Sequence, residues 1–241
     1  MGMKSAVKRI IAATGYELRR RSTEPFGQDP FGDMRELARS SDRPVIFDVG
    51  ANIGQTIDDF RRVFAHPQIH SFEPGQDAFA ELQKRTSGIP DLHLNRCALG
   101  AQPGTIELIE NTSSPMSSIL EPSVDCWGSV KQRRQVSVRT LDEYCEANSL
   151  SSIDILKSDT QGYDLEVIKG GRQLLEHGRI GMIYLEIILS DMYKGSARLD
   201  EIYGFLADHG LSLLAFYKIH YKKQRAGWTD ALFINWAYDP K

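Results

Sequence analysis

The sequence predicts an α/β fold built on a parallel sheet, and three short stretches support this prediction. The first, residues 45–54, is an apolar run that ends in an acid and two glycines. A run this short that stops at glycine is typical of a buried parallel strand followed by a tight turn. The other two, residues 68–73 and 153–159, are strand-like and end in an acidic residue. Apolar residues at helical spacing follow each stretch, so strands and helices alternate along the chain.

Length and composition are those of an ordinary globular protein. The 241 residues are 41% hydrophobic and 25% charged, which allows one large domain or two small ones. The net charge of −3 gives no sign of a nucleic-acid partner. Three widely separated cysteines, Cys97, Cys126 and Cys145, predict reduced thiols in a cytoplasmic compartment. No apolar run has the length of a membrane span or of a signal-peptide core.

The first 42 residues predict a helical extension and a linker ahead of the main domain, residues 43–241. Residues 1–22 hold six basic residues and one acidic residue, with apolar side chains at helical spacing. This helix would lie on an anionic membrane or glycolipid surface, or pack on its own domain or a second subunit. Its short apolar face favours packing. Residues 22–32 contain the prolines and glycines of a linker, and a helix at about 33–39 leads to the first strand.

The glycine turn after the first strand predicts a ligand site with a charge preference. Gly50 and Gly54 resemble glycines of the dinucleotide fingerprint, but Asn52 stands near the place of the glycine that admits a pyrophosphate. Asp48, just before the turn, would repel phosphate and favour a cationic, phosphate-free ligand such as S-adenosylmethionine. A tight strand–helix turn without any ligand remains the alternative.

Two more acids are expected at the same edge of the sheet. Glu73 ends the second strand, where an acid commonly binds the two ribose hydroxyls of NAD or of S-adenosylmethionine. Alternatively, Glu73 is an acid at the start of the helix that Pro74 opens. Asp159 ends the fourth strand and should reach the edge that carries Asp48 and Glu73.

The middle of the chain departs from strand–helix alternation. After a third strand at 92–99, residues 104–109 and 135–138 alternate in polarity and predict an inserted β-hairpin. The serine-rich loop 111–118 between them would gate the site, contact a polar acceptor or simply be solvated. Residues 140–148 predict a helix with a capping box at its start.

The last third of the chain predicts three more strands. Residues 180–188 form the fifth, 211–217 the sixth and 231–236 the seventh, with a helix at 197–209. Glu186 is the only charged residue in the fifth strand, so it should lie near a strand end or be paired. The segment that joins the last two strands is basic and aromatic.

Seven segments together resemble the FkbM family of S-adenosylmethionine-dependent methyltransferases over residues 43–236. They are VIFDVGANIGQT (45–56), HSFEP (70–74), NRCALG (95–100), NTSSPMSS (111–118), VRTLDEY (138–144), LKSDTQGYDLEVIKGG (156–171) and DALFIN (230–235). Their order and spacing are specific, although each alone would be weak. The family usually has an apolar residue at the position of Ser158, a departure that leaves Asp159 and Gly162 unaffected.

The resemblance implies a class I methyltransferase (Rossmann-like) fold, with a seven-stranded sheet, helices on both faces and an antiparallel last strand. It also implies methyl transfer to oxygen, often to a sugar hydroxyl of a glycolipid, polysaccharide or glycosylated natural product. At the matching positions, the methionine part of the cofactor would contact Asp48, Gly50, Asn52 and Gly54, and the ribose would contact Glu73. The adenine would lie near Asn95, Cys97 and Ala98. The transferred methyl group would face Asp159 and Gln161.

A sugar hydroxyl is a poor nucleophile at neutral pH, so a base should take its proton. Asp159 is the first candidate, and His220, Glu186 and His70 follow. Asp159 would alternatively position the cofactor without proton transfer. A metal site formed by Asp159, Glu186 and Asp230 is conceivable, but nothing in their spacing demands one and none is expected.

Two other functions stay open. An NAD-dependent sugar oxidoreductase would share the strand–turn–helix start and the ribose acid, but not the glycine spacing or Asp48. A module that binds the cofactor without catalysis is the third alternative. The expected partner is a saccharide or glycolipid acceptor, with no nucleic acid, and the sequence leaves both a monomer and a homo-oligomer open. Any contact with a membrane would go through the basic N-terminal helix.

Overall fold

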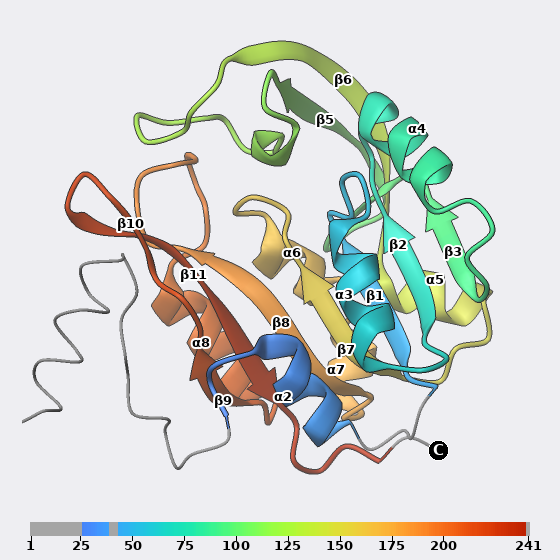
Figure 1. Ribbon diagram of the computed structural model, residues 1–241. Coiled ribbons are helices and arrows are strands. Elements are labelled where there is room, and N and C mark those ends of the chain that lie inside the picture. Colours follow the sequence, from blue (N-terminus) through green and yellow to red (C-terminus); the bar gives the residue numbers. More distant parts are fainter. Residues whose placement is uncertain (1–25, 39–42, 240–241) are drawn as a thin grey trace, which may run out of the picture.

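The computed structural model describes residues 26–38 and 43–239, which form a main sheet, a smaller sheet and surrounding helices (Figure 1). The helices are α2 (Pro30–Leu37), α3 (Gln55–Val63), α4 (Gln76–Arg85), η1 (Ser114–Met116), α5 (Leu141–Ala147), α6 (Asp164–Lys169), α7 (Arg172–Glu176) and α8 (Leu199–Asp208). The strands are β1 (Val45–Val49), β2 (Gln68–Phe72), β3 (Leu92–Asn95), β4 (Ala98–Leu99), β5 (Gly104–Asn111), β6 (Val130–Arg139), β7 (Ile153–Ser158), β8 (Ile180–Ile188), β9 (Ser212–Phe216), β10 (His220–Lys222) and β11 (Arg225–Ile234).

The main sheet has the order β3-β2-β1-β7-β8-β11, and both β9 and β10 pair with β11. The first five strands of this order are parallel, whereas β11 runs antiparallel to β8. The predicted parallel sheet with an antiparallel last strand is therefore confirmed. The order reverses at β1, so the carboxyl ends of β1 and β7 open a crevice of the kind that binds ligands.

Two details of the sheet prediction are wrong. The described part of the sheet has eight strands rather than seven, because the basic and aromatic segment forms β10 and a β-hairpin with an early start of β11. The rings of His220 and Trp228 stack 4.8 Å apart across this hairpin, a cross-strand contact that stabilises it. The predicted third strand is also divided, because residues after Asn95 leave the main sheet and pair with β6.

Helices cover both faces of the sheet, as predicted (Figure 1). On one face, α2, α3 and α4 bury residues such as Met34, Phe60 and Leu82 against β1 and β2. On the other face, α5 to α8 bury residues such as Ile168 and Leu206 against the strand side chains that point to that side of the sheet. Strands buried on both faces account for the continuous apolar runs in the sequence.

The insertion is a second, three-stranded sheet of β4, β5 and β6, with β5 and β6 antiparallel. It arches over the edge of the main sheet at which the parallel strands end (Figure 1). The chain then enters α5 through the predicted capping box, in which Thr140 Oγ1 accepts a hydrogen bond from the Glu143 amide.

The predicted basic helix lies outside the described residues. The helix before the first strand begins at Pro30 rather than near residue 33, since Asp29 caps it by accepting a hydrogen bond from the Phe31 amide. Within the described ranges, no helix has the length and apolarity needed to cross a membrane.

Candidate active site

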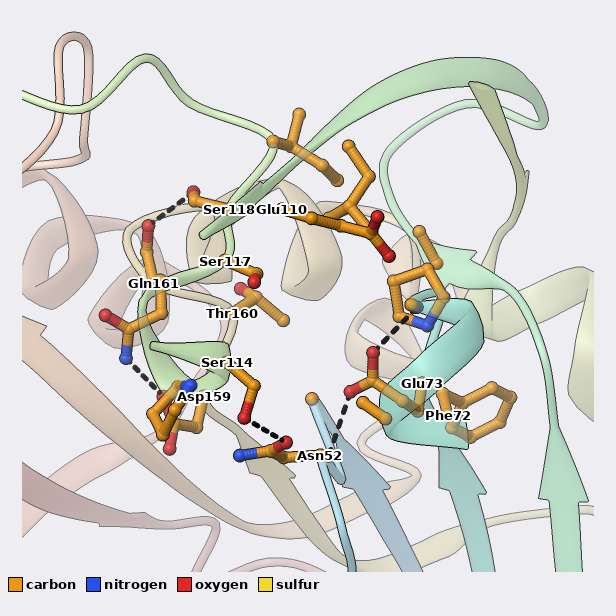
Figure 2. Close-up of a pocket in the computed structure, with 18 of the residues that line it drawn as sticks. Asn52, Phe72, Glu73, Glu110, Ser114, Ser117, Ser118, Asp159, Thr160 and Gln161 are labelled. Carbon is orange, nitrogen blue, oxygen red and sulfur yellow. Dashed lines mark hydrogen bonds between the residues drawn. The ribbon is translucent and has the colours of Figure 1, made fainter. Parts of the chain in front are cut away.

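A pocket of about 930 Å³, open to solvent, lies at the carboxyl ends of β1, β2 and β7 and under the insertion. The residues around it come from the turns after the three strands, from 97–99 and from the insertion (Figure 2). Those predicted from the sequence are Gly50, Asn52, Glu73, Cys97, Ala98, Asp159 and Gln161.

The two glycines of the first turn are required by close backbone approaches. Gly50 has a φ of 75°, and a Cβ there would lie 2.0 Å from the carbonyl oxygen of Asp159. Gly54 begins α3 with a φ of 92°, and its Cβ would lie 2.8 Å from Leu82 Cδ1. Gly50 thus lets the turn after β1 touch the turn after β7, whereas Gly54 does not line the pocket and serves the packing of α3.

Glu73 is held rigidly at one end of the pocket. Its Oε2 accepts a hydrogen bond from the Asn52 amide at 2.9 Å, and its Oε1 accepts one from the Gly75 amide at 2.7 Å. Burial raises the pKa of Glu73, and the two amide hydrogen bonds oppose that rise. Each carboxylate oxygen keeps a second lone pair, so Glu73 can accept two further hydrogen bonds from a ligand's hydroxyls.

Asp48 is fully buried and lies outside the pocket lining. Its Oδ1 is 3.0 Å from Nζ of Lys157, which also donates a hydrogen bond to the Gly50 carbonyl at 3.2 Å. Burial opposes the charge of this ammonium, but Asp48 and Asp159 outweigh burial and raise the pKa of Lys157. The argument that Asp48 repels phosphate is therefore wrong, because Lys157 neutralises it.

At the other end of the pocket, the side-chain amide of Gln161 joins three side chains (Figure 2 shows its bond to Asp159). Its Nε2 donates to Asp159 Oδ1 at 2.9 Å and to Glu186 Oε1 at 3.0 Å. Its Oε1 accepts a hydrogen bond from the Tyr193 hydroxyl at 2.8 Å. With all its amide atoms engaged, Gln161 fixes the position of both carboxylates.

Three acids stand in a row across neighbouring strands. Glu186 and Asp230 are register partners on β8 and β11, and Asp159 follows directly after β7. Burial, followed by the charge of Asp159, raises the pKa of Glu186 to about 9. Burial also raises the pKa of Asp230, although a hydrogen bond from Tyr184 opposes the rise. In the described ranges, no group of three or more His, Cys, Asp or Glu side chains is arranged to hold a metal ion.

The remaining predicted residues lie away from the pocket lining. Asn95 uses its amide to donate to the Ser71 carbonyl and the Tyr144 hydroxyl. His220 stacks on Trp228 in the β10–β11 hairpin. His70 is a core residue whose Nδ1 lies 2.8 Å from the Tyr144 hydroxyl, and burial lowers its pKa to about 4. His70 therefore does not lie where a base at the pocket would have to lie.

The serine-rich loop forms the roof of the pocket, so the interpretation of a purely solvated loop is wrong. Ser114 Oγ donates to Asn52 Oδ1 at 3.1 Å, and Ser118 Oγ donates to the Gln161 carbonyl at 2.8 Å (Figure 2). The roof is thereby attached to the turns after both β1 and β7.

Sequence reasoning missed several residues that shape the site. Asp164 organises the turn after β7 by accepting hydrogen bonds from the Ser158 hydroxyl at 2.5 Å and the Thr160 amide at 2.9 Å. Ser158, at a position where the family usually has an apolar residue, thus has a partner for its buried hydroxyl. Glu110 also lines the pocket, at an inward position of an alternating strand, where a charge is itself a signal.

Charge and shape in this pocket fit S-adenosylmethionine. Its lining holds four acids, Glu73, Asp77, Glu110 and Asp159, and one base, Lys131. An acidic lining suits a cationic sulfonium and disfavours a pyrophosphate. The lining also holds apolar side chains that suit a planar base, and these residues are called the apolar slot: Phe72, Ala78, Cys97, Ala98, Leu99 and Leu108.

Comparisons with known proteins agree with this assignment. The family profile described as "Methyltransferase FkbM domain" matches residues 48–213. The chain is 27% identical over 178 residues to the 2-O-methyltransferase NoeI of Sinorhizobium fredii (strain NBRC 101917 / NGR234), covering 68% of this chain and 71% of the relative. It is 24% identical over 229 residues to methyltransferase sdnD of Sordaria araneosa, covering 82% of each.

Solved structures with a similar chain path include an rRNA methylase from Streptococcus thermophilus, with a TM-score of 0.49 at 11% identity, covering 85% of this chain and 93% of that one. Another is the magnesium protoporphyrin IX methyltransferase of Synechocystis PCC 6803 with bound S-adenosylmethionine, with a TM-score of 0.47 at 11% identity, covering 98% of each chain. Since the family profile spans more than half of the 241 residues, this chain belongs to the FkbM family of S-adenosylmethionine-dependent methyltransferases.

Proposed function

We propose that this protein is an O-methyltransferase that methylates a sugar hydroxyl of a glycolipid, polysaccharide or glycosylated natural product. The observation that carries the proposal is the hydrogen-bonded unit of Asp159, Gln161 and Glu186, which places a fixed carboxylate beside the pocket. The similarity to NoeI, a 2-O-methyltransferase, supports oxygen as the methylated atom.

Bound S-adenosylmethionine supplies an electrophilic methyl group on a cationic sulfur. The acceptor oxygen must stand about 3 Å from that methyl group and opposite the sulfur, and positioning of this kind provides most of the rate. Asp159 is suited to take the hydroxyl proton as the new bond forms. Glu186, whose pKa is about 9, keeps its own proton at neutral pH and so is not available as the base.

Acceptor chemistry follows from the charge at this end of the site. Asp159 is the acid of the row that lines the pocket, while Glu186 keeps its proton, so an acceptor with phosphate or carboxylate groups near the reacting hydroxyl would face the Asp159 carboxylate and be repelled. A neutral polyol such as a sugar ring meets no such penalty, and its hydroxyls can donate to the acids. The NAD-dependent oxidoreductase alternative gains no support, because the acidic lining disfavours a pyrophosphate.

The experiment has a binding arm and a transfer arm. Calorimetric titration with S-adenosylhomocysteine should show binding, whereas NADH should give no heat. Labelled S-adenosylmethionine should then transfer its methyl group to saccharides and glycolipids in an acceptor panel that also holds amines, carboxylic acids and RNA. Absence of binding to S-adenosylhomocysteine would refute the cofactor assignment, and labelling confined to RNA or amines would refute the sugar acceptor.

A further inference from the structure

Glu110 is a buried carboxylate whose charge is not fully compensated within the described protein. The residue is 7% exposed, and its Oε2 has no hydrogen-bond partner among the described residues. Arg134 Nε lies 3.7 Å from this oxygen, which is too far for a hydrogen bond, and it is also without a hydrogen-bond partner there. Oε2 is fully enclosed, so a ligand would bond to the other oxygen, Oε1, which lies on the side of Gly75. Because burying an incompletely paired carboxylate is costly, a ligand that supplies a donor to Oε1 would gain affinity.

The carboxylate points into the pocket at the end that holds Glu73 (Figure 2). Both carboxylates flank Gly75: a Cβ at Gly75 would lie 2.8 Å from Glu73 Oε1 and 3.6 Å from Glu110 Oε1. Leu108 precedes Glu110 by two residues on β5, so the two side chains share one face of the strand and both line the pocket. Glu110 therefore shares a strand face with Leu108 of the apolar slot and lies beside the ribose acid.

A carboxylate can only accept hydrogen bonds, which limits its partner on the cofactor. The adenosyl part carries two kinds of donor: the ribose hydroxyls and the exocyclic amino group of adenine. An acid at the end of the second strand takes the ribose hydroxyls, and here that acid is Glu73. The donor left for a second acceptor at the slot is the amino group.

We infer that Glu110 accepts a hydrogen bond from the exocyclic amino group of adenine and thereby selects adenine over a base with a carbonyl oxygen at that position. The inference rests on the S-adenosylmethionine site of the proposed function and adds a specificity determinant to it. Hypoxanthine presents an acceptor where adenine presents a donor, so its oxygen would face the Glu110 carboxylate without a proton between them.

The test compares S-adenosylhomocysteine with S-inosylhomocysteine by calorimetry. The wild-type protein should bind the adenosyl compound at least about tenfold more tightly, which is the size of one hydrogen bond to a charged group. In Glu110→Gln, the amide can turn its NH₂ group to the hypoxanthine oxygen. The preference should therefore fall about tenfold or more, with weaker adenosyl binding and equal or tighter inosyl binding.

Glu107→Gln is the matched control, since Glu107 lies on the same strand but is partly exposed, lies outside the pocket lining and is paired with Arg133 at 2.8 Å. It should leave both dissociation constants unchanged. A wild-type protein that binds both compounds equally, or a Glu110→Gln variant that weakens both by the same factor, overturns the inference. A wild-type protein that binds neither compound contradicts the proposed function instead, so the two failures are distinguishable.

Discussion

Lys157 Nζ lies 3.0 Å from Asp48 Oδ1, and the two residues are direct register partners on β7 and β1. Their side chains are 6% and 0% exposed, so the pair sits in a region of low dielectric beneath the glycine turn. Lys157 also donates to the carbonyls of Val49 and Gly50, at 3.4 and 3.2 Å. One ammonium therefore connects the central strand pair to the backbone of the pocket floor.

We expect Lys157→Met to destabilise the protein by about 3–5 kcal/mol, because it leaves Asp48 buried and uncompensated. Urea unfolding followed by circular dichroism measures the loss. The control is Lys169→Met, which removes a half-exposed pair with Glu166 and should cost less than about 1 kcal/mol. Similar losses in both variants would contradict the role given to the buried pair.

Gly50→Ala should abolish binding of S-adenosylhomocysteine, because the new Cβ would lie 2.0 Å from the carbonyl oxygen of Asp159 and drive the two turns apart. Gly88→Ala is the control, because it introduces the strain of a positive φ without the clash. Gly88 has a similar φ of 81°, but its Cβ would meet nothing within 4 Å, so it should lose only about 1–2 kcal/mol of stability and keep its affinity. Calorimetry and thermal unfolding of both variants check this, and equal affinity in both would be incompatible with touching turns.

Asp159→Asn should keep the affinity for S-adenosylhomocysteine within a few-fold and lower turnover about a hundredfold or more, because the amide cannot take the acceptor's proton. Rates are measured with labelled cofactor and the acceptor found in the panel. Asp208→Asn, an exposed position in α8, is the control and should leave both quantities unchanged. Unchanged turnover in Asp159→Asn would show that Asp159 is not the base.

Glu186→Gln should gain stability relative to the wild type as pH rises. The pKa of Glu186 is raised from 4.5 to about 9 in the folded protein, so the folded state holds a proton that the unfolded state releases. The stability that the protonated Glu186 side chain contributes to the wild type is complete below pH 4.5 and is lost as pH rises to about 9. The difference between the melting temperatures of the variant and the wild type should therefore grow from pH 5 through pH 7 to pH 9, with the glutamine variant higher at pH 9. A difference independent of pH would contradict the raised pKa.

Local signals in the sequence predicted the fold well, because each of its parallel strands is a short apolar run that ends in a turn. The acids at the carboxyl edge followed from topology alone, as Glu73 and Asp159 show. The β10–β11 hairpin was not predicted, because β10 has only three residues and is stabilised by the contact of His220 with Trp228 on the other strand.

The partners of charged residues could not be predicted in the same way. Asp48 looked like a free acid in the glycine turn, but the neutralising ammonium comes from a strand more than a hundred residues later. Other residues also act on the site through distant contacts, as Tyr193 does by donating a hydrogen bond to Gln161. Such residues have no recognisable pattern in the sequence around them. Only the packing of β7 against β1 brings them together.

The position of the acidic row depends on the register of its strands. Glu186 faces Asp230 across β8 and β11, while its neighbours Leu185 and Ile187 point into the opposite apolar core. A slip of one residue would exchange these faces, placing a leucine or isoleucine at the reaction edge and a carboxylic acid in hydrocarbon. A chain with this register error would lose the acidic row and also bury an unpaired acid, so the proposed methyl transfer would report on correct strand register.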